Sequence, residues 1–328
     1  MAKMAGVSYA TVSRALNGSD QVNEKTRQRV QEICDSVGYS PNALARGLVT
    51  NSSNAIGLII PNITNPFYPE VALGVEGEAR ARGYNVFLCN SNFEPERMES
   101  YFRILIERRV EGLIVASVPD AARGLFDFYR KRMPVVYIGS RPADEECNCV
   151  ATDSVKGGYL AADHLIKLGH QRIVFIGGTR TSNSQIDKLK GFRLAMEENG
   201  LQPEVRLNIN YQYNKRESGY DMAKVLIQEK NPPTAIMGSN DMVALGALEA
   251  CEEYGLDVPG DMSIIGFDDI PYASLPKIQL TTIAQAKDQL GKIAVDMLFK
   301  LKENGLKNNC MKEVLQPELI IRSSCRKL

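Results

Sequence analysis

The sequence predicts an α/β protein with a small helical domain at its N-terminus, on three observations. The chain has 328 residues, which is more than one hydrophobic core usually organises, so two or three domains are expected. Its first 53 residues carry short helical patterns and no strand-like alternation. From residue 55 onward, short apolar runs alternate with longer amphipathic stretches, which is typical of parallel sheets covered by helices.

Composition and charge exclude several classes of protein. The chain is 44% hydrophobic and 24% charged, and no apolar run approaches the ~18 residues of a membrane span, so no membrane contact is expected. The segment 1–18 has no apolar core of a secretory signal. Seven scattered cysteines fit a reducing cytoplasm, and Cys147 and Cys149, with no histidine nearby, are expected to be ordinary thiols and not a metal site. The first 53 residues hold six basic and four acidic side chains, an excess that permits a nucleic-acid partner.

Two short helices separated by a tight turn are predicted at the start of the chain. Ser8 can cap a helix over 9–17, and Gly18 suits the left-handed turn after it. Just upstream, 2–7 is predicted to hold part of another helix that ends at Gly6. With a rotation of ~100° per residue, one side of this helix carries Thr11, Val12, Ala15 and Leu16, which are expected to pack. The other side carries Tyr9, Ala10, Ser13, Arg14 and Asn17, which face solvent and are almost all able to form hydrogen bonds. This arrangement allows a second helix to enter the major groove of DNA.

A third helix and a short further segment follow. Asn23 is predicted to cap the third helix and Gly38 to close it. Its predicted packing face consists of Val30, Ile33, Cys34 and Val37. Ser40 can then cap a short helix over 42–48, with Pro41 at its start. Seven residues are too few for a stable isolated helix, so this hinge segment is expected to fold when a partner such as DNA supplies contacts.

Polar residues follow nearly every predicted strand of the second part. Strands are predicted at 56–60, 85–89, 112–116, 135–138, 173–176, 235–237 and 263–265. Polar or glycine-rich turns follow at Asn62, 90–92, Ser117, 139–141, 177–179, 239–241 and 268–269. Parallel sheets bind ligands in the crevice at the carboxyl ends of their strands, so a cleft for a small polar molecule is expected.

Short motifs in a fixed order carry a family resemblance along the whole chain. They include 5–18, 26–27, 38–42, 45–48, 56–61, 65–68, 112–114, 168–170, 191–192, 217–219, 233–235, 240–241, 244–246, 266–268 and 280–283. Each fragment alone is weak, but their order and spacing resemble the lactose-repressor (LacI/GalR) family of bacterial transcription regulators. Family members usually carry one more helical turn ahead of the part matched by 2–5. Either the start of the chain is assigned too late or the headpiece lacks this turn, and the second case is expected to weaken its fold and its DNA affinity.

The resemblance implies DNA contacts for the headpiece and the hinge segment. It implies that Tyr9, Ala10 and Arg14 read base edges. It implies that Ser8, Thr11, Ser13 and Asn17 contact the DNA backbone. In the hinge helix, it implies minor-groove contacts by Asn42, Ala45 and Leu48. Physical chemistry agrees, since the Arg14 fork can pair with guanine and an apolar wedge such as Leu48 can unstack a base step. The alternatives are that Tyr9 is a solvated aromatic and that Leu48 packs against its own domain.

The resemblance also implies domain boundaries and a fold like that of periplasmic sugar-binding proteins, with two doubly wound parallel sheets. The headpiece is expected over 1–40, the hinge helix and linker over 41–54, and an effector-binding and dimerisation domain over 55–328. Crossovers are expected near Asp153, Thr282 and Lys312. They divide the last domain into lobe one, 55–153 and 284–311, and lobe two, 154–282 and 313–328.

Five residues match the family's effector pocket. The resemblance implies that Phe67 and Tyr68 form its aromatic wall, that Asn240 and Asp268 form its polar floor, and that Lys188 takes the place of a common arginine. A carboxylate and an amide can bond vicinal hydroxyls while a ring covers the apolar face of a sugar. A sugar or sugar derivative is therefore the expected effector, with no cofactor and no metal. Lys188 lacks the planar fork of arginine, and Asp268 could instead be a helix cap or turn residue.

These features predict an effector-responsive DNA-binding transcription regulator, specifically a repressor of carbohydrate or related small-metabolite genes in the bacterial cytoplasm. Its expected partners are a pseudo-palindromic double-stranded DNA operator, a small-molecule effector and a second copy in a homodimer. The chain end at 326–328 shows no heptad tail, so no tetramer is expected. One alternative is the solute-binding protein of a transporter, which would need an export signal. The other, a metabolic enzyme, is disfavoured because GxxxxGK[ST], HExxH, GxSxG and a GxGxxG after the first strand are absent.

Overall fold

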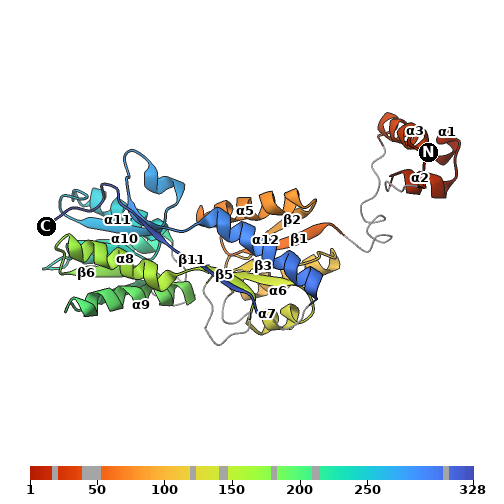
Figure 1. Cartoon of the computed structure of the whole chain (residues 1–328). Helices are drawn as coiled ribbons and strands as arrows, with labels where there is room; N and C mark the ends of the chain where they lie inside the picture. Colours follow the sequence, from red (N-terminus) through yellow and green to blue (C-terminus); the bar gives the residue numbers. More distant parts are fainter. Residues whose placement is uncertain are drawn as a thin grey trace. The chain divides into compact units, whose positions relative to one another are not determined.

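The chain folds into two compact units, Met1–Asn54 and Ala55–Leu328, each of which is drawn in Figure 1. The computed structural model describes residues 1–16, 21–38, 53–118, 123–139, 147–178, 183–208, 215–305 and 310–328. Within these residues, no helix combines the length and the apolar character needed to cross a membrane.

The described part of the first unit is a helical headpiece. It contains α1 (Ala2–Ala5), α2 (Tyr9–Leu16) and α3 (Glu24–Ser36), as the sequence predicts. Its core consists of Ala5, Val12, Ala15, Val22, Val30 and Cys34. Gly6, with φ 66°, supplies the left-handed turn after α1, and the Asn23 side chain caps α3 by accepting a hydrogen bond from the backbone N–H of Thr26. The prediction that Val37 packs was wrong: it follows the last residue of α3 and is 49% exposed.

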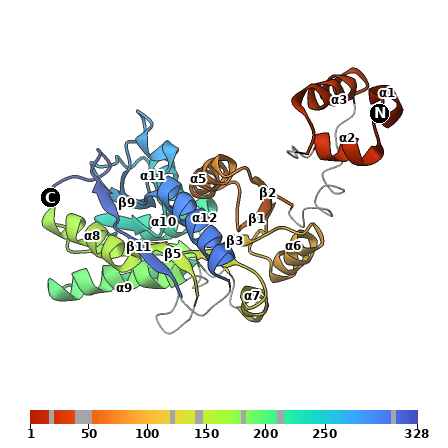
Figure 2. The same ribbon diagram turned by 45° about the vertical axis from the view of Figure 1, so that its right-hand side comes forward.

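Lobe one of the second unit is a parallel sheet between two helical layers. The strand order is β11-β5-β4-β3-β1-β2, and the strands pair in parallel. The strands are β1 (Ala55–Ile60), β2 (Asn85–Asn90), β3 (Leu113–Ala116), β4 (Val135–Ile138), β5 (Cys149–Thr152) and β11 (Lys312–Leu315). Helices α5 (Phe67–Ala81) and α12 (Lys287–Asn304) cover one face, and α6 (Pro95–Glu107) and α7 (Arg123–Arg130) the other (Figure 2). Because both faces are covered, β1 can be a continuous apolar run.

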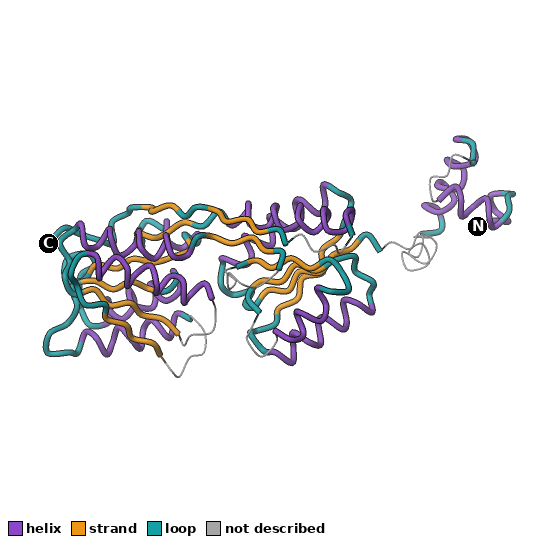
Figure 3. The backbone as a smooth tube through the Cα atoms, turned by 60° about the horizontal axis from the view of Figure 1, so that its bottom comes forward, coloured by secondary structure: helices purple, strands orange, loops and turns teal. Residues whose placement is uncertain are grey.

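Lobe two repeats this layered plan. Its strand order is β12-β10-β9-β8-β6-β7, with β12 antiparallel to β10 and the other pairs parallel. The strands are β6 (Ile173–Gly178), β7 (Glu204–Asn208), β8 (Ala235–Gly238), β9 (Ser263–Asp268), β10 (Thr281–Ala284) and β12 (Glu318–Ile320). Helices α8 (Ser154–Lys167) and α9 (Asn183–Glu198) cover one face, and α10 (Arg216–Ile227) and α11 (Asp241–Glu253) the other, while η2 (Pro271–Ser274) lies between β9 and β10. Figure 3 shows the strands of each lobe between its helices.

The described chain crosses between the lobes at three places. The first crossing lies at Asp153, between β5 and α8. The second follows Ala284, two residues after the expected position Thr282, because β10 pairs with β9 of lobe two along its whole length. The third follows Leu315, three residues after the expected position Lys312, because β11 pairs with β5 of lobe one. The lobe boundaries expected at 284 and 313 are corrected accordingly: 284 belongs to lobe two, and 313–315 belong to lobe one.

Candidate DNA interface and effector pocket

Helix α2 presents a polar face to solvent. Tyr9 is 87% exposed, and Ala10, Ser13 and Arg14 are exposed as well. Val12 and Ala15 on the opposite face are buried in the headpiece core. This division follows the helical period, which puts residues three or four positions apart on one side. The structure therefore brings the three predicted base-reading side chains to one accessible surface.

Hydroxyl groups cap the start of α2. The Ser8 Oγ accepts a hydrogen bond from the backbone N–H of Thr11 at 3.1 Å, and the two side-chain oxygens lie 2.9 Å apart. Ser8 is exposed and Thr11 half-buried, so both stand beside the exposed face of α2. The other predicted DNA contacts, Asn17, Asn42, Ala45 and Leu48, and the predicted hinge helix over 42–48 lie outside the described residues.

One cavity of about 100 Å³ collects all five predicted effector residues. Phe67 and Tyr68 open α5 after β1, Lys188 lies on α9 after β6, Asn240 precedes α11 after β8, and Asp268 ends β9. Each therefore stands at or beyond the carboxyl end of a parallel strand, where doubly wound sheets bind ligands. Because these strands belong to both sheets, the cavity is lined by both lobes.

Two adjacent rings form the aromatic side of this pocket. The centroids of Phe67 and Tyr68 lie 5.1 Å apart with an interplanar angle of 86°. The Asn65 Oδ1 accepts a hydrogen bond from the backbone N–H of Phe67 at 3.1 Å and so holds the start of α5. Burial raises the pKa of Tyr68 far above its ordinary value. The phenol therefore stays protonated and can donate a hydrogen bond into the pocket.

A buried lysine and a buried aspartate face each other on the polar side. The Lys188 Nζ lies 3.7 Å from Asp268 Oδ1, donates a hydrogen bond to the Ser239 carbonyl oxygen at 3.0 Å, and stands 3.8 Å from the centroid of the Phe267 ring. Burial lowers the pKa of Lys188 and raises that of Asp268, and the attraction between the two charges opposes both shifts. Asp268 Oδ1 also accepts a hydrogen bond from Gln285 Nε2 at 2.7 Å. The pocket thus presents one ammonium and one carboxylate, each held in place by protein partners.

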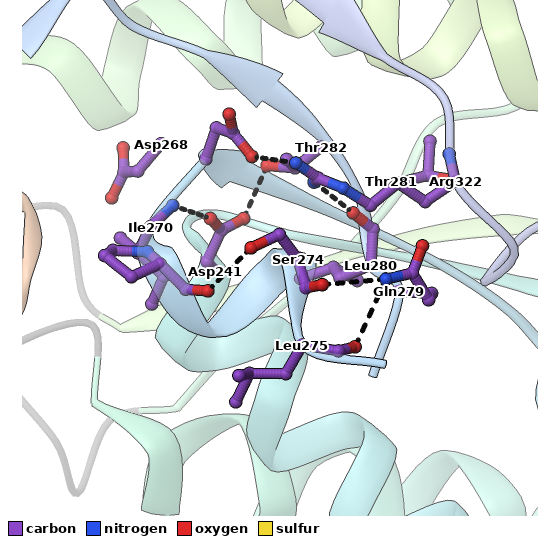
Figure 4. A network of polar contacts seen from close by, with 12 residues as sticks. Asp241, Asp268, Ile270, Ser274, Leu275, Gln279, Leu280, Thr281, Thr282 and Arg322 are labelled. Carbon is purple, nitrogen blue, oxygen red and sulfur yellow. Dashed lines mark hydrogen bonds and ion pairs between the residues drawn. The ribbon is translucent and has the colours of Figure 1, made fainter. Parts of the chain in front are cut away.

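Behind the pocket, a buried polar network fixes the end of β9 (Figure 4). Asp241 accepts hydrogen bonds from the Thr282 hydroxyl at 2.5 Å and from the backbone N–H of Ile270 at 2.8 Å. Burial raises the pKa of Asp241 to about 7. Arg322 donates to the Asp269 carboxylate at 2.7 Å and to the Leu280 carbonyl oxygen at 2.8 Å. These bonds tie the segment after β9 to β10 and the C-terminal segment, and so position Asp268.

Sequence reasoning missed several residues that line the same cavity. They are Asn65, Tyr137, Ile138, Ala151, Thr152, Ser154, Ser184, Gln185, Gln285 and Leu290, whereas Ser117 and Gly139 lie in turns from which the sequence predicted the cleft. Many lie at or just beyond the end of a strand, so their position in the chain was the available signal. Thr152 is 5% exposed, and its hydroxyl has no hydrogen-bond partner among the described residues. Burial of a hydroxyl group without a hydrogen bond costs free energy of folding, unless a ligand or water forms the missing hydrogen bond.

Comparison with known proteins shows the family of the chain. Residues 1–42 match the family described as "Bacterial regulatory proteins, lacI family", and residues 162–325 match a "Periplasmic binding protein-like domain". The HTH-type transcriptional regulator DegA of Bacillus subtilis (strain 168) is 36% identical over 327 residues, which cover 99% of this chain and 96% of DegA. The chain belongs to the lacI family.

Further LacI-family members agree in length and fold. The HTH-type transcriptional repressor PurR of Actinobacillus pleuropneumoniae serotype 3 (strain JL03) is 36% identical over 100% of this chain and 98% of its own length. The lac repressor dimer bound to operator and the anti-inducer ONPF is similar with a TM-score of 0.87 and 28% identity, covering 99% of this chain and 97% of that one. A LacI-family regulator of Enterococcus faecium with bound ribose has a TM-score of 0.74 and 27% identity, covering 84% and 99%.

These similarities extend over both units of the protein. The chain is an effector-responsive, DNA-binding transcription regulator of the LacI family, with a helix-turn-helix domain and a domain like the periplasmic binding proteins. Its relatives are regulators and not enzymes. They also do not support the alternative of a transporter's solute-binding protein, which the two-lobed cleft alone left open.

Proposed function

We propose that this LacI-family regulator is a homodimeric repressor that reads a pseudo-palindromic operator through α2 and responds to a sugar or sugar derivative bound between its lobes. The observation that carries the proposal is the exposed face of α2, on which Tyr9, Ala10 and Arg14 stand together. A helix with this polar face fits the major groove of DNA, and an arginine fork can bond the two acceptors of guanine there.

Backbone contacts would set the orientation of α2 in the groove. Ser8, Thr11 and Ser13 carry hydroxyls beside its exposed face, and hydroxyls can donate to phosphate oxygens. We assign Asn17 to the same role, and Asn42, Ala45 and Leu48 to the minor groove at the operator centre, from the family motif that they match. Because such a regulator acts on chromosomal DNA, we place it in the bacterial cytoplasm.

The effector proposal follows from the chemistry of the pocket. Asp268 offers acceptors and Lys188 a cation, and Phe67 and Tyr68 offer an apolar wall. Asn240, whose Oδ1 caps α11 by accepting a hydrogen bond from the backbone N–H of Val243, offers the N–H donors of its amide. A molecule that carries several hydroxyls and one apolar face satisfies all of them, which describes a pentose or a hexose. The E. faecium neighbour holds ribose, which is such a molecule. No cofactor is required for this role.

The homodimer proposal rests on exposed apolar side chains at one edge of lobe one. Leu73 on α5 is 69% exposed, and Phe87 and Leu88 on β2 are each 45% exposed. β2 lies at the end of the strand order, so its outer edge has no neighbouring strand within the sheet as described. Exposed apolar edges are sites of association with a second chain. A second copy bound here would supply the other headpiece that a pseudo-palindromic operator requires.

The DNA-reading role can be tested by selection from random duplexes. The wild type is expected to select a dyad, and Arg14→Ala is expected to lose about 5- to 150-fold in affinity and the preference at one base pair of each half-site. Arg29→Ala, at an exposed arginine of α3, removes the same charge and should leave the selected sequence unchanged. If Arg14→Ala selects the same dyad as the wild type, Arg14 does not read bases.

A further inference from the structure

Three cysteines lie together at the start of two neighbouring strands of lobe one. In the β11–β5 pairing Lys312 is the partner of Cys149, and Cys310 and Cys147 each lie two positions ahead of this pair and contact each other. The backbone N–H of Cys149 donates to the Met311 carbonyl oxygen at 2.9 Å, and the backbone N–H of Met311 donates to Asn148 Oδ1 at 3.0 Å. These bonds hold the two segments in contact just ahead of the strands.

The thiol groups themselves approach one another. The Cys310 thiol donates a hydrogen bond to the carbonyl oxygen of Cys147. The thiols of Cys147 and Cys149 are hydrogen-bonded to each other. This hydrogen bond and burial both raise the pKa of Cys149. Cys147 and Cys149 are buried, whereas Cys310 is exposed. The cluster thus combines one accessible thiol with two sheltered ones, and the described chain holds no disulfide.

We propose that Cys310 and Cys147 are a reversible thiol modification site that closes to a disulfide in the presence of a peroxide. Neighbouring strands of a sheet are about 4.8 Å apart, which is within the Cα separation that a disulfide spans. The exposed Cys310 thiol takes an oxygen atom from the peroxide and becomes a sulfenic acid, while the peroxide is reduced to water or an alcohol. The Cys147 sulfur then attacks the Cys310 sulfur, the S–S bond forms, and the sulfenic oxygen leaves as water with the Cys147 proton.

The disulfide would join the two strands that lead to the first and third crossings between the lobes. β5 runs into α8 of lobe two, and β11 runs into β12 of lobe two. The two cysteines are 163 positions apart in the sequence, so the bond closes a long loop and restricts the unfolded chain strongly. Oxidation is therefore expected to raise the thermal stability of the effector domain. This inference does not depend on the identity of the operator or the effector.

The experiment oxidises the purified full-length protein with a small excess of hydrogen peroxide, blocks the remaining thiols and maps the peptides without reduction. The expected product is an intramolecular link to Cys310 with a loss of two titratable thiols from the seven, and a Tm higher by several degrees that dithiothreitol reverses. Cys147→Ser and Cys310→Ser should each abolish the link and the shift in Tm. Cys149→Ser should retain both, as should Cys89→Ser, which removes a half-buried thiol elsewhere in lobe one.

Three results would overturn the proposal. The first is a link that survives Cys147→Ser and is lost in Cys149→Ser, which would assign the partner to Cys149. The second is a link between two chains. The third is peroxide treatment that yields only sulfinic or sulfonic acid at Cys310 while Cys147 stays reduced.

Discussion

At the scale of single residues, two buried charges line the proposed effector pocket. Asp268 and Lys188 face each other at 3.7 Å, and each makes only part of the hydrogen bonds that its charge favours. A ligand with hydroxyl groups can complete them, whereas an apolar ligand of the same size would leave both charges poorly solvated.

Removal of the Asp268 charge should therefore weaken effector binding. Asp268→Asn removes a charged acceptor, so the dissociation constant of the sugar that the wild type binds is expected to rise about 10- to 150-fold, as measured by isothermal titration calorimetry. Asp288→Asn, an exposed carboxylate on α12 paired with Lys292, is the matched control and should bind like the wild type. Equal affinities for all three proteins would remove Asp268 from the binding site.

Asp241 is expected to make stability depend on pH. Its folded pKa is about 7, above the ordinary value of 3.8. A carboxyl with a raised folded pKa binds more protons in the folded state, so the free energy of unfolding decreases as the pH rises from about 4 to about 7 and then levels off. The contribution is at most about 4 kcal/mol at 1.36 kcal/mol per pKa unit.

This pH dependence can be measured by urea unfolding between pH 4.5 and 8. Asp241→Asn should flatten the curve in that range, whatever its effect on absolute stability. Asp268, whose pKa burial also raises, contributes a slope of the same sign, so some slope should remain in the variant. His164 and His170, whose pKa burial lowers, contribute a slope of the opposite sign, so the test compares the slope of Asp241→Asn with that of the wild type. Equal slopes in the two proteins would contradict the prediction.

At the scale of elements, glycines allow pairs of helices to approach closely. In α8 and α9, a methyl group on Gly158 would collide with the Lys188 carbonyl oxygen, and one on Gly191 would collide with that of Val155. The pairs α10–α11 and α5–α12 repeat this arrangement, with Gly219 and Gly246 and with Gly74 and Gly291. Because α9 carries Lys188, its approach to α8 also determines where the ammonium stands in the pocket.

Two glycine substitutions are expected to have opposite effects on stability, one at the close contact of α8 and α9 and one at an open position of α5. Gly191→Ala should destabilise the protein by about 1–3 kcal/mol, because backbone and not a flexible side chain would have to move. Gly77→Ala, on an exposed position of α5 with open space around it, should stabilise by about 0.5–1 kcal/mol. Chemical unfolding measures both values, and a neutral Gly191→Ala would show that the two helices separate easily.

At the scale of the whole molecule, operator binding is expected to depend on pairing of two chains. Two linked headpieces gain affinity because the second half-site is bound in an intramolecular step, typically by a factor of 10²–10⁴. The proposed contact surface, Leu73, Phe87 and Leu88, lies on lobe one. A shift between lobe arrangements in response to an effector would then act on two headpieces together.

Phe87→Lys tests this dependence. A charge on the edge strand β2 should dissociate the dimer in analytical ultracentrifugation and reduce operator affinity about 100-fold or more, while effector binding stays the same. Leu194→Lys, on α9 of lobe two, adds the same charge at a position with similar exposure, 43%, and should remain dimeric. A dimeric Phe87→Lys protein would place the interface elsewhere.

The sequence by itself determines the local features of this regulator, because caps, helical periods and buried apolar runs act over a few neighbouring residues. It predicts α2 and α3 with their caps and the strands that are buried on both faces, whereas the five pocket residues came from the resemblance to the LacI family. The strands β5, β7, β10, β11 and β12 were not predicted. β11 is largely exposed and β12 is only partly buried, and exposure weakens the apolar signal of a strand.

Only the tertiary structure decides which sheet each strand joins, because the sequence of a strand does not specify which strand it pairs with. That is why the crossings expected near Thr282 and Lys312 lie after Ala284 and Leu315. The same holds for Thr152, Gln285 and the cysteine cluster, whose members are distant in the chain. Their roles depend on distances of a few ångströms between segments, which pairing and packing of the folded lobes create.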